Sequence, residues 1–261
     1  MSLLEGKTVV VSGVGAGLGH QVAAAVVRDG GNAVLGARTE ANLAKSAAGI
    51  DPDGAHTAYR PTDITDEEQC AALAALATER FGRIDAVVHV AAWDSCFGGL
   101  EDADFTTWQS VIDVNLLGTL RMTRACLPAL KSCGGSVVFI GTQSAVAAPS
   151  QVRQAAYAAS KGALTSAMYS LARELGPHRI RVNTVLPGWM WGPPVQAYVQ
   201  FTAQTEGVPE AEVLGRLTGR MALPELATDG DVADAAVFLA SDRARAITGQ
   251  SLLVNAGELM R

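Results

Sequence analysis

A tyrosine and a lysine four positions apart are the residues of this sequence best suited to acid–base chemistry. Tyr157 and Lys161 lie in Tyr-Ala-Ala-Ser-Lys, within a segment of strong helix-forming character, so both side chains project from one helix face. A tyrosine has an unperturbed pKa of about 10, and a neighbouring ammonium favours its phenolate. The pair could supply a general base, although the same spacing also occurs in ordinary amphipathic helices.

A glycine-rich segment, Ser12-Gly-Val-Gly-Ala-Gly-Leu-Gly19, follows a β-branched run and leads into a helix. Glycines let the backbone approach a pyrophosphate, and a helix N-terminus presents unpaired N–H groups to it. The strict G-x-G-x-x-G spacing is absent, so a flexible turn is the alternative interpretation. The phosphate-binding interpretation predicts cofactor contacts from Ser12, Gly13, Ala16, Gly17, Leu18 and Gly19.

Arg38 follows the next strand, about twenty residues beyond the glycine-rich segment, where dinucleotide folds recognise the ribose 2′ position. An arginine without a neighbouring carboxylate can bind a 2′-phosphate through charge-assisted hydrogen bonds. We therefore predict a preference for NADP(H), with NAD(H) possible. The alternative is that Arg38 stacks on the adenine or faces solvent.

These residues must be positioned by an alternation of strands and helices. We predict strands at 7–12, 33–36, 84–90, 136–140, 180–186 and 251–255, and helices at 19–28, 65–81, 104–130, 155–175 and 231–240, with a capping box at Thr65–Glu68. Such alternation predicts an α/β fold over residues 1–261: a single-domain, doubly wound, Rossmann-like parallel sheet with helices on both faces. Ligands then bind outside the carboxyl ends of the strands.

Together these motifs resemble the short-chain dehydrogenase/reductase family over nearly the whole chain. The matching features are the glycine-rich segment, Asp63, Asn115, Ser144, Tyr157, Lys161, Pro187-Gly188 and Ile247-Thr-Gly-Gln250. The resemblance implies an NAD(P)-dependent oxidoreductase that interconverts a secondary alcohol and a ketone, with Tyr157 as general acid and base. A cationic nicotinamide ring would further favour the phenolate.

The resemblance also implies roles for three further polar residues. Ser144, thirteen residues before Tyr157, would hydrogen-bond the substrate oxygen. Thr142 is the alternative, because it lies two residues after the apolar strand. Asn115 would lie in a locally distorted helix and help hold a water between the lysine and solvent, or else it is a buried structural amide.

Further cofactor contacts are implied by family position. Asp63-Ile64 would contact the adenine, with a helix-capping surface turn as the alternative. Ala91 would contact the cofactor ribose and Pro187-Gly188 the nicotinamide side. Where many relatives carry a threonine, this chain has Gly192, so backbone groups near Met190 are expected to hold the carboxamide. His89 replaces a family asparagine, and we expect it to be structural rather than catalytic.

Residues 193–224 form an insertion with no strand of its own, and we predict a substrate lid there. Aromatic residues beyond the predicted strand ends are candidate walls of an apolar pocket: Trp93, Trp189, Trp191 and Tyr198, with Phe97, Met190 and Phe201 nearby. Such walls suit a hydrophobic carbonyl compound, cyclic or bulky. Ordinary core or interface packing is the alternative for each.

Composition excludes several classes of function. The 261 residues are 49% hydrophobic and 18% charged, with a net charge of −6, which disfavours nucleic-acid or membrane partners. The four cysteines have no metal-site spacing, and no run is long enough to cross a bilayer, so we expect a cytoplasmic protein. The resemblance implies a homotetramer or homodimer. Rival functions are a catalytically silent NADP-binding regulatory protein and an epimerase or dehydratase.

Overall fold

The computed structural model describes residues 2–148 and 152–261, and in this part of the chain seven strands form one sheet. The strands are β1 (Thr8–Ser12), β2 (Asn32–Ala37), β3 (Thr57–Pro61), β4 (Ala86–His89), β5 (Gly135–Ile140), β6 (Ile180–Pro187) and β7 (Ser251–Val254). Their order is β3-β2-β1-β4-β5-β6-β7, and all neighbours are parallel. The order reverses between β1 and β4, which places a ligand crevice at their carboxyl ends.

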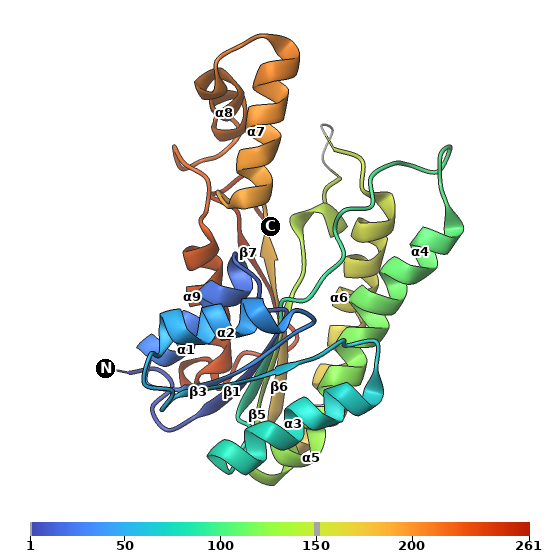
Figure 1. Cartoon of the computed structure of the whole chain (residues 1–261). Coiled ribbons are helices and arrows are strands. Elements are labelled where there is room, and N and C mark those ends of the chain that lie inside the picture. The colour runs from blue at the N-terminus through green and yellow to red at the C-terminus, as the bar shows by residue number, and fades with distance from the viewer. Residues whose placement is uncertain (1, 149–151) are drawn as a thin grey trace.

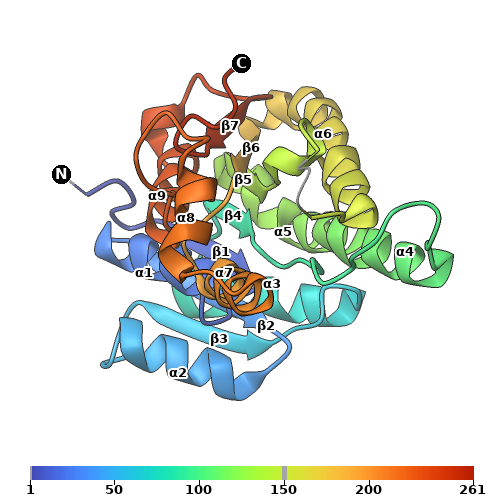
Figure 2. The same ribbon diagram turned by 90° about the horizontal axis from the view of Figure 1, so that it is seen from above.

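Helices cover both faces of the sheet, as Figure 2 shows. The helices α1 (Leu18–Arg28), α2 (Glu40–Ile50) and α9 (Asp229–Ala240) bury their apolar residues in one cluster. On the other face, α3 (Glu67–Phe81), α5 (Thr119–Cys133) and α6 (Ala155–Leu175) share a second cluster. This arrangement confirms the predicted doubly wound fold.

The sequence of β1 shows why its strand is apolar throughout. Val9 and Val11 face the first cluster and Val10 faces the second, all with no exposed surface. A central parallel strand is covered on both sides, so it reads as a continuous apolar run rather than as an alternating one.

The start of α3 differs from the prediction. The expected capping box at Thr65–Glu68 is wrong, because Asp66 is the N-cap and accepts hydrogen bonds from the backbone N–H groups of Glu68 (2.9 Å) and Gln69 (3.1 Å). The Thr65 hydroxyl instead donates to Asp63 (2.8 Å). A carboxylate is a good N-cap beside the positive end of a helix dipole. The N-cap is therefore one residue later than predicted, at Asp66.

The long helix expected over 104–130 is divided into three parts. An α-helix, α4 (Phe105–Ile112), continues into a π-helix at Asp113–Gly118 and then into α5. Asn115 lies inside this π-helix, which is the local distortion expected around it. π-Helical turns are rare and occur frequently at functional sites.

Residues 193–224 carry two helices, α7 (Pro193–Glu206) and α8 (Glu210–Thr218), which project beyond the sheet in Figure 1. They pack on a small cluster of their own that includes Val199 and Leu217. The ends of the segment are joined, since the Trp191 N–H donates to the Ala227 carbonyl at 2.7 Å.

In the part of the chain that the structure describes, no helix combines the length and apolar character that a membrane span requires. No group of three or more His, Cys, Asp or Glu side chains in residues 2–148 and 152–261 could hold a metal ion.

Candidate functional site

A cavity of about 1200 Å³ lies at the carboxyl end of the sheet. Its walls come from segments far apart in the sequence: the glycine-rich segment, the loops after β4, β5 and β6, the start of α6, and α7. A volume of this size exceeds the needs of a small substrate, since pockets for drug-sized ligands span about 300–1,000 Å³.

The glycine-rich segment packs too closely for side chains at two positions. Gly13 has φ +94, and a Cβ placed on it would lie 2.1 Å from the Ala91 nitrogen. A Cβ on Gly19 would lie 2.2 Å from the Gly13 carbonyl oxygen. The N-cap of α1, Gly17, provides no side-chain cap, so the first N–H groups of α1 are not capped by that residue. This geometry suits an anion at the helix N-terminus.

Only part of the predicted segment reaches the cavity among the residues described. Ala16, Gly17 and Leu18 line it, whereas the buried Ser12 hydroxyl faces His89. Gly13 and Gly19 do not line the cavity, but they allow the close backbone packing that forms the turn.

The expected adenine end lies beyond β2 and β3, which are neighbouring strands with Ala37 beside Pro61. Arg38 is exposed there. The Asp63 carboxylate accepts from the N–H (2.9 Å) and hydroxyl (2.8 Å) of Thr65, so it stabilises its own turn. Ile64 is buried, and a Cβ on Gly118 would lie 2.8 Å from its side chain.

Tyr157 and Lys161 lie on successive turns of α6, with the lysine Nζ 6.0 Å from the centre of the tyrosine ring. Lys161 is buried and donates to the Ile140 carbonyl at the end of β5 (2.7 Å). Burial lowers the pKa of Lys161 to about 8. Burial raises the pKa of Tyr157, although a hydrogen bond with Thr142 acts in the opposite direction. The expected lowering of the Tyr157 pKa by the lysine together with a cationic nicotinamide ring stays a prediction for the cofactor-bound protein.

Asp94 is a charged residue of the site that the sequence analysis did not single out. It lines the cavity in the loop after β4. Its negative charge raises the pKa of both Tyr157 and Lys161. The sequence did offer one signal, because Asp94 lies just beyond Ala92 in the loop after β4, at the carboxyl end of a strand where ligands are expected.

Asn115 connects the loop after β4 to α6. Its side chain exchanges two hydrogen bonds with the backbone of Trp93 (2.7 and 3.0 Å) and donates to the Ser160 hydroxyl (2.9 Å). Ser160 in turn donates to the Tyr157 carbonyl (2.7 Å). The Asn115 amide is fully buried.

Both candidate substrate hydroxyls, Ser144 and Thr142, line the cavity with Tyr157. Thr142 caps a short 3₁₀ helix by accepting from the Ser144 N–H (3.2 Å), and its hydroxyl also interacts with the phenol. Within the described residues, no hydrogen bond engages the Ser144 hydroxyl.

His89 is a buried histidine whose tautomer follows from its partners. The Thr123 hydroxyl donates to the Thr119 carbonyl (2.8 Å), so it accepts from Nε2–H of His89 (2.9 Å). Nδ1 then accepts from the Ser12 hydroxyl (3.3 Å). Burial, reinforced by the charge of Lys161, lowers the pKa of His89 to about 3. The ring is neutral and engaged on both sides, as a structural histidine would be.

A polar wall of the cavity comes from residues that no motif indicated. Arg220 and Glu258 form an ion pair at 3.0 Å, and Gln143 donates to the same carboxylate at 3.0 Å. The Arg220 guanidinium lies 6.0 Å from the centre of the Trp189 ring. These residues come from the end of α8, the C-terminal segment and the loop after β5, so only folding brings them together.

Of the predicted pocket residues, Trp189 and Tyr198 line the cavity with ring centres 5.1 Å apart. Trp93 and Trp191 are not among the described residues that line it. Of the residues expected to border the nicotinamide, Pro187, Gly188 and Met190 line the cavity, and the aromatic residues Phe97 and Phe201 line it too. Ala91 packs behind the glycine turn instead.

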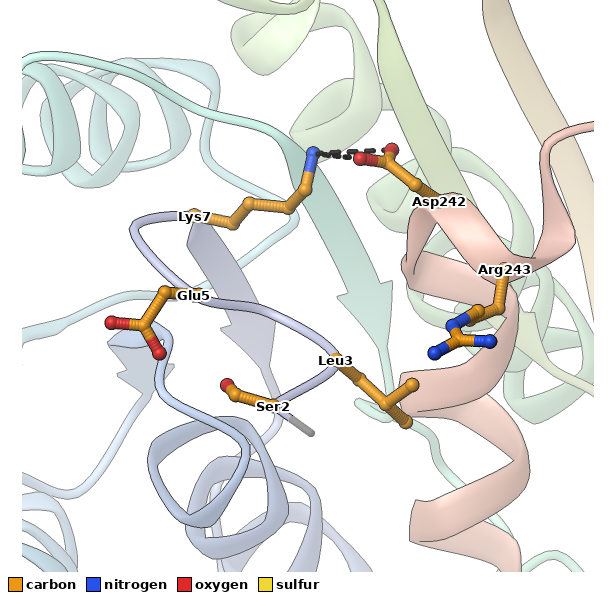
Figure 3. Close-up of a pocket in the computed structure, with 6 residues that line it drawn as sticks. All are labelled: Ser2, Leu3, Glu5, Lys7, Asp242 and Arg243. Carbon is orange, nitrogen blue, oxygen red and sulfur yellow. Dashed lines mark hydrogen bonds and ion pairs between the residues drawn. The ribbon is translucent and has the colours of Figure 1, made fainter.

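A second, smaller cavity of about 250 Å³ lies at the other end of the sheet (Figure 3). It is lined by the segment before β1 and by Asp242 and Arg243, and Lys7 pairs with Asp242 at 3.0 Å. Because Lys7 precedes β1, this cavity lies at the amino ends of the strands and away from Tyr157.

Comparison with known proteins gives consistent results. A family model described as Enoyl-(Acyl carrier protein) reductase matches residues 13–258. L-fucose dehydrogenase of Bos taurus is 32% identical, over 97% of this chain and 89% of the relative. Trans-4-hydroxycyclohexanecarboxylate dehydrogenase of Sinomonas cyclohexanicum is 32% identical, over 97% and 92%.

Solved structures give the same picture. Carveol dehydrogenase of Mycobacterium avium, solved in complex with NAD, superposes with a TM-score of 0.91 at 27% identity and full coverage of both chains. A short-chain type dehydrogenase/reductase of Mycobacterium ulcerans gives 0.88 at 30% identity, covering 99% of this chain and 91% of that one.

Proposed function

The chain belongs to the short-chain dehydrogenase/reductase family, and we propose that it interconverts a secondary alcohol and a ketone with a nicotinamide cofactor. The observation that carries the proposal is the placement of Tyr157 above Lys161 on α6, at a cavity that the glycine-rich segment also lines. In this proposal one cavity holds Tyr157 as general acid and base, a hydroxyl donor, and the glycine turn that would bind an anion.

In reduction, the Tyr157 phenol donates its proton to the ketone oxygen. Burial raises its pKa, which keeps the proton-donating form populated at neutral pH. The Ser144 hydroxyl, or Thr142 as the alternative, donates to the same oxygen and stabilises its developing charge. The bound cofactor supplies the hydride for reduction and accepts it in oxidation. In oxidation Tyr157 takes the alcohol proton, and the Lys161 ammonium favours the resulting phenolate.

The residues present fit a dinucleotide. The tight turn at Gly13 and the N-terminus of α1 would hold the pyrophosphate, and Pro187, Gly188 and Met190 would border the nicotinamide. Asp63 and Ile64 would border the adenine. We propose NADP(H) as the preferred cofactor, because the exposed Arg38 follows β2 without an acid at that position.

The substrate we propose is a hydrophobic, cyclic or bulky secondary alcohol. Phe97, Trp189, Tyr198 and Phe201 supply an aromatic lining beside Tyr157. A relative that acts on trans-4-hydroxycyclohexanecarboxylate, by its name, supports a cyclic substrate.

A cofactor titration tests the first part. NADPH and NADH are added to wild type, Arg38→Ala and the surface control Arg80→Ala, at the end of α3, and nicotinamide fluorescence is followed. We expect NADPH to bind more tightly than NADH, and Arg38→Ala to weaken NADPH selectively. Equal binding unaffected by Arg38→Ala would refute the preference, and binding of neither cofactor would refute the proposed function.

A screen of cyclic and linear ketones with the preferred cofactor tests the chemistry. We expect Tyr157→Phe to lose roughly 10²–10⁴-fold in turnover while its cofactor affinity is retained, because the ring still packs but no proton can be transferred. Full turnover in Tyr157→Phe would exclude Tyr157 as the acid.

A further inference from the structure

Asp229 is a half-buried carboxylate on the wall of the main cavity, at the first residue of α9. It is not needed to cap that helix, because Thr228 and Asp231 already form a complete capping box. No hydrogen bond or ion pair joins its carboxylate to another group in residues 2–148 and 152–261. Burial raises the pKa of the Asp229 carboxyl, as expected for an acid without a partner.

Two glycines from different segments lie against this carboxylate. A Cβ placed on Gly192, in the turn after β6, would lie 3.1 Å from each of its oxygens. A Cβ placed on Gly17, at the start of α1, would lie 3.2 Å from Oδ2. The Asp229 carboxylate therefore fills the space that a side chain at position 192 would take, between the anion-binding turn and the turn that borders Met190.

We propose that Asp229 is a cofactor-positioning residue that accepts a hydrogen bond from the carboxamide N–H of the nicotinamide, in the space left open by Gly192. This inference rests on the proposed cofactor. Asp229 lies at the junction of the pyrophosphate and nicotinamide sides of the cavity. The pyrophosphate offers only acceptors and repels a carboxylate, whereas the carboxamide presents an N–H donor that an unpartnered carboxylate can bind.

The test changes the residue and the ligand together. Affinities are measured by calorimetry for NADP⁺, for its 3-acetylpyridine analogue, which has a methyl ketone in place of the carboxamide, and for 2′-phospho-ADP-ribose, which has no nicotinamide. The proteins are wild type, Asp229→Ala, Asp229→Asn and the control Asp234→Ala, an exposed acid on the same helix that pairs with Arg28. Thermal unfolding verifies that each variant is folded.

We expect wild type to bind NADP⁺ roughly tenfold or more tightly than the acetylpyridine analogue, because the analogue lacks the donor to a charged acceptor. Asp229→Ala should abolish this preference by weakening NADP⁺ alone. Asp229→Asn should keep part of it through its carbonyl oxygen, and the control should keep all of it.

Two results would overturn the inference. One is a preference of equal size in wild type and Asp229→Ala. The other is tighter binding of all three ligands by Asp229→Ala, which would make Asp229 a source of repulsion toward the pyrophosphate. Absence of binding to wild type by every one of these ligands and by NAD⁺ would instead refute the proposed function, so the two failures are distinguishable.

Discussion

Burial acts on Tyr157 and Lys161 by disfavouring charge on each of them. It raises the pKa of Tyr157 and lowers that of Lys161 to about 8. The tyrosine is thus a proton donor before any ligand binds, and the phenolate required for oxidation depends on positive charge nearby. Lys161 supplies such charge below pH 8, where its ammonium form predominates.

The two hydroxyls near Tyr157 make separable predictions. We expect Ser144→Ala to lower kcat roughly 10²–10³-fold, because its hydroxyl is unengaged and available to the substrate oxygen. Thr142→Ala should have a smaller effect, since Thr142 already caps the 3₁₀ helix and contacts the phenol. Steady-state kinetics of ketone reduction would measure the kcat of both variants. A larger loss in Thr142→Ala would assign the substrate contact to Thr142.

His89 should make the protein sensitive to acid. Its pKa of about 3 in the folded state lies below the usual value of about 6.5, so between these values the unfolded chain binds the extra proton. Stability is therefore fully present above pH 6.5 and falls as the pH drops, by about 1.4 kcal/mol per pH unit.

The variant His89→Asn should remove this slope. Urea unfolding followed by tryptophan fluorescence at pH 7 and pH 5 should show a smaller loss of unfolding free energy in the variant than in wild type. Parallel losses would show that His89 is accessible to protons in the folded state.

At the residue level, the sequence was informative where chemistry depends on local spacing. Tyr157 and Lys161 are one helical turn apart, so their proximity followed from the sequence. Asp229 and Gly192, or Arg220 and Glu258, meet only because α7 and α8 return the chain to the cavity. No period or motif links such residues. Burial, which raises the pKa of Tyr157, depends on the same packing of distant segments.

The α7–α8 segment can be tested as a substrate lid. Phe201 on α7 lines the cavity while 69% exposed, so a bulky substrate could cover it. We expect Phe201→Ala to raise KM for a hydrophobic ketone about fivefold to tenfold, with NADPH affinity unchanged, because apolar contact area is lost. The neighbouring Gln200→Ala, which alters an exposed residue, is the control. An unchanged KM would place the substrate away from α7.

At the level of elements, buried strands and amphipathic helices were predictable, and α2 and β3 were not. β3 is an edge strand with mostly exposed residues, Tyr59 among them, so it lacks the apolar run that identified β1. Residues 193–224 were expected to be an insertion without strands. The helices α7 and α8 found there are stabilised by a small apolar cluster to which both contribute residues, so neither could be predicted alone.

For the whole molecule, we propose a homotetramer or homodimer in which a second copy covers β7 and the adjacent part of α6. β7 is an edge strand with Leu252 41% exposed, and Tyr169 on α6 is 54% exposed. The two elements are close, since a Cβ on Gly249 would lie 3.7 Å from Ala172. An exposed apolar edge invites pairing with another chain.

Light scattering coupled to size exclusion would test this assembly. Wild type should elute at a multiple of 27.0 kDa, and Leu252→Glu should shift toward the single-chain mass. A monomeric wild type would remove the proposal.

The π-helix at Asp113–Gly118 constrains the length of the chain more than its composition. A π-turn holds one more residue than an α-turn, so loss of one residue would let the helix close as a continuous α-helix. The wide turn accommodates that extra residue without changing the faces of the flanking turns, so α4 and α5 would keep their orientation while Asn115 would shift from its position. Asn115 would then lose its hydrogen bonds to the Trp93 backbone and the Ser160 hydroxyl, beside Tyr157. We therefore expect substitutions along this stretch to be tolerated far more often than a deletion. Related sequences should vary here in residue type but not in the length of the segment.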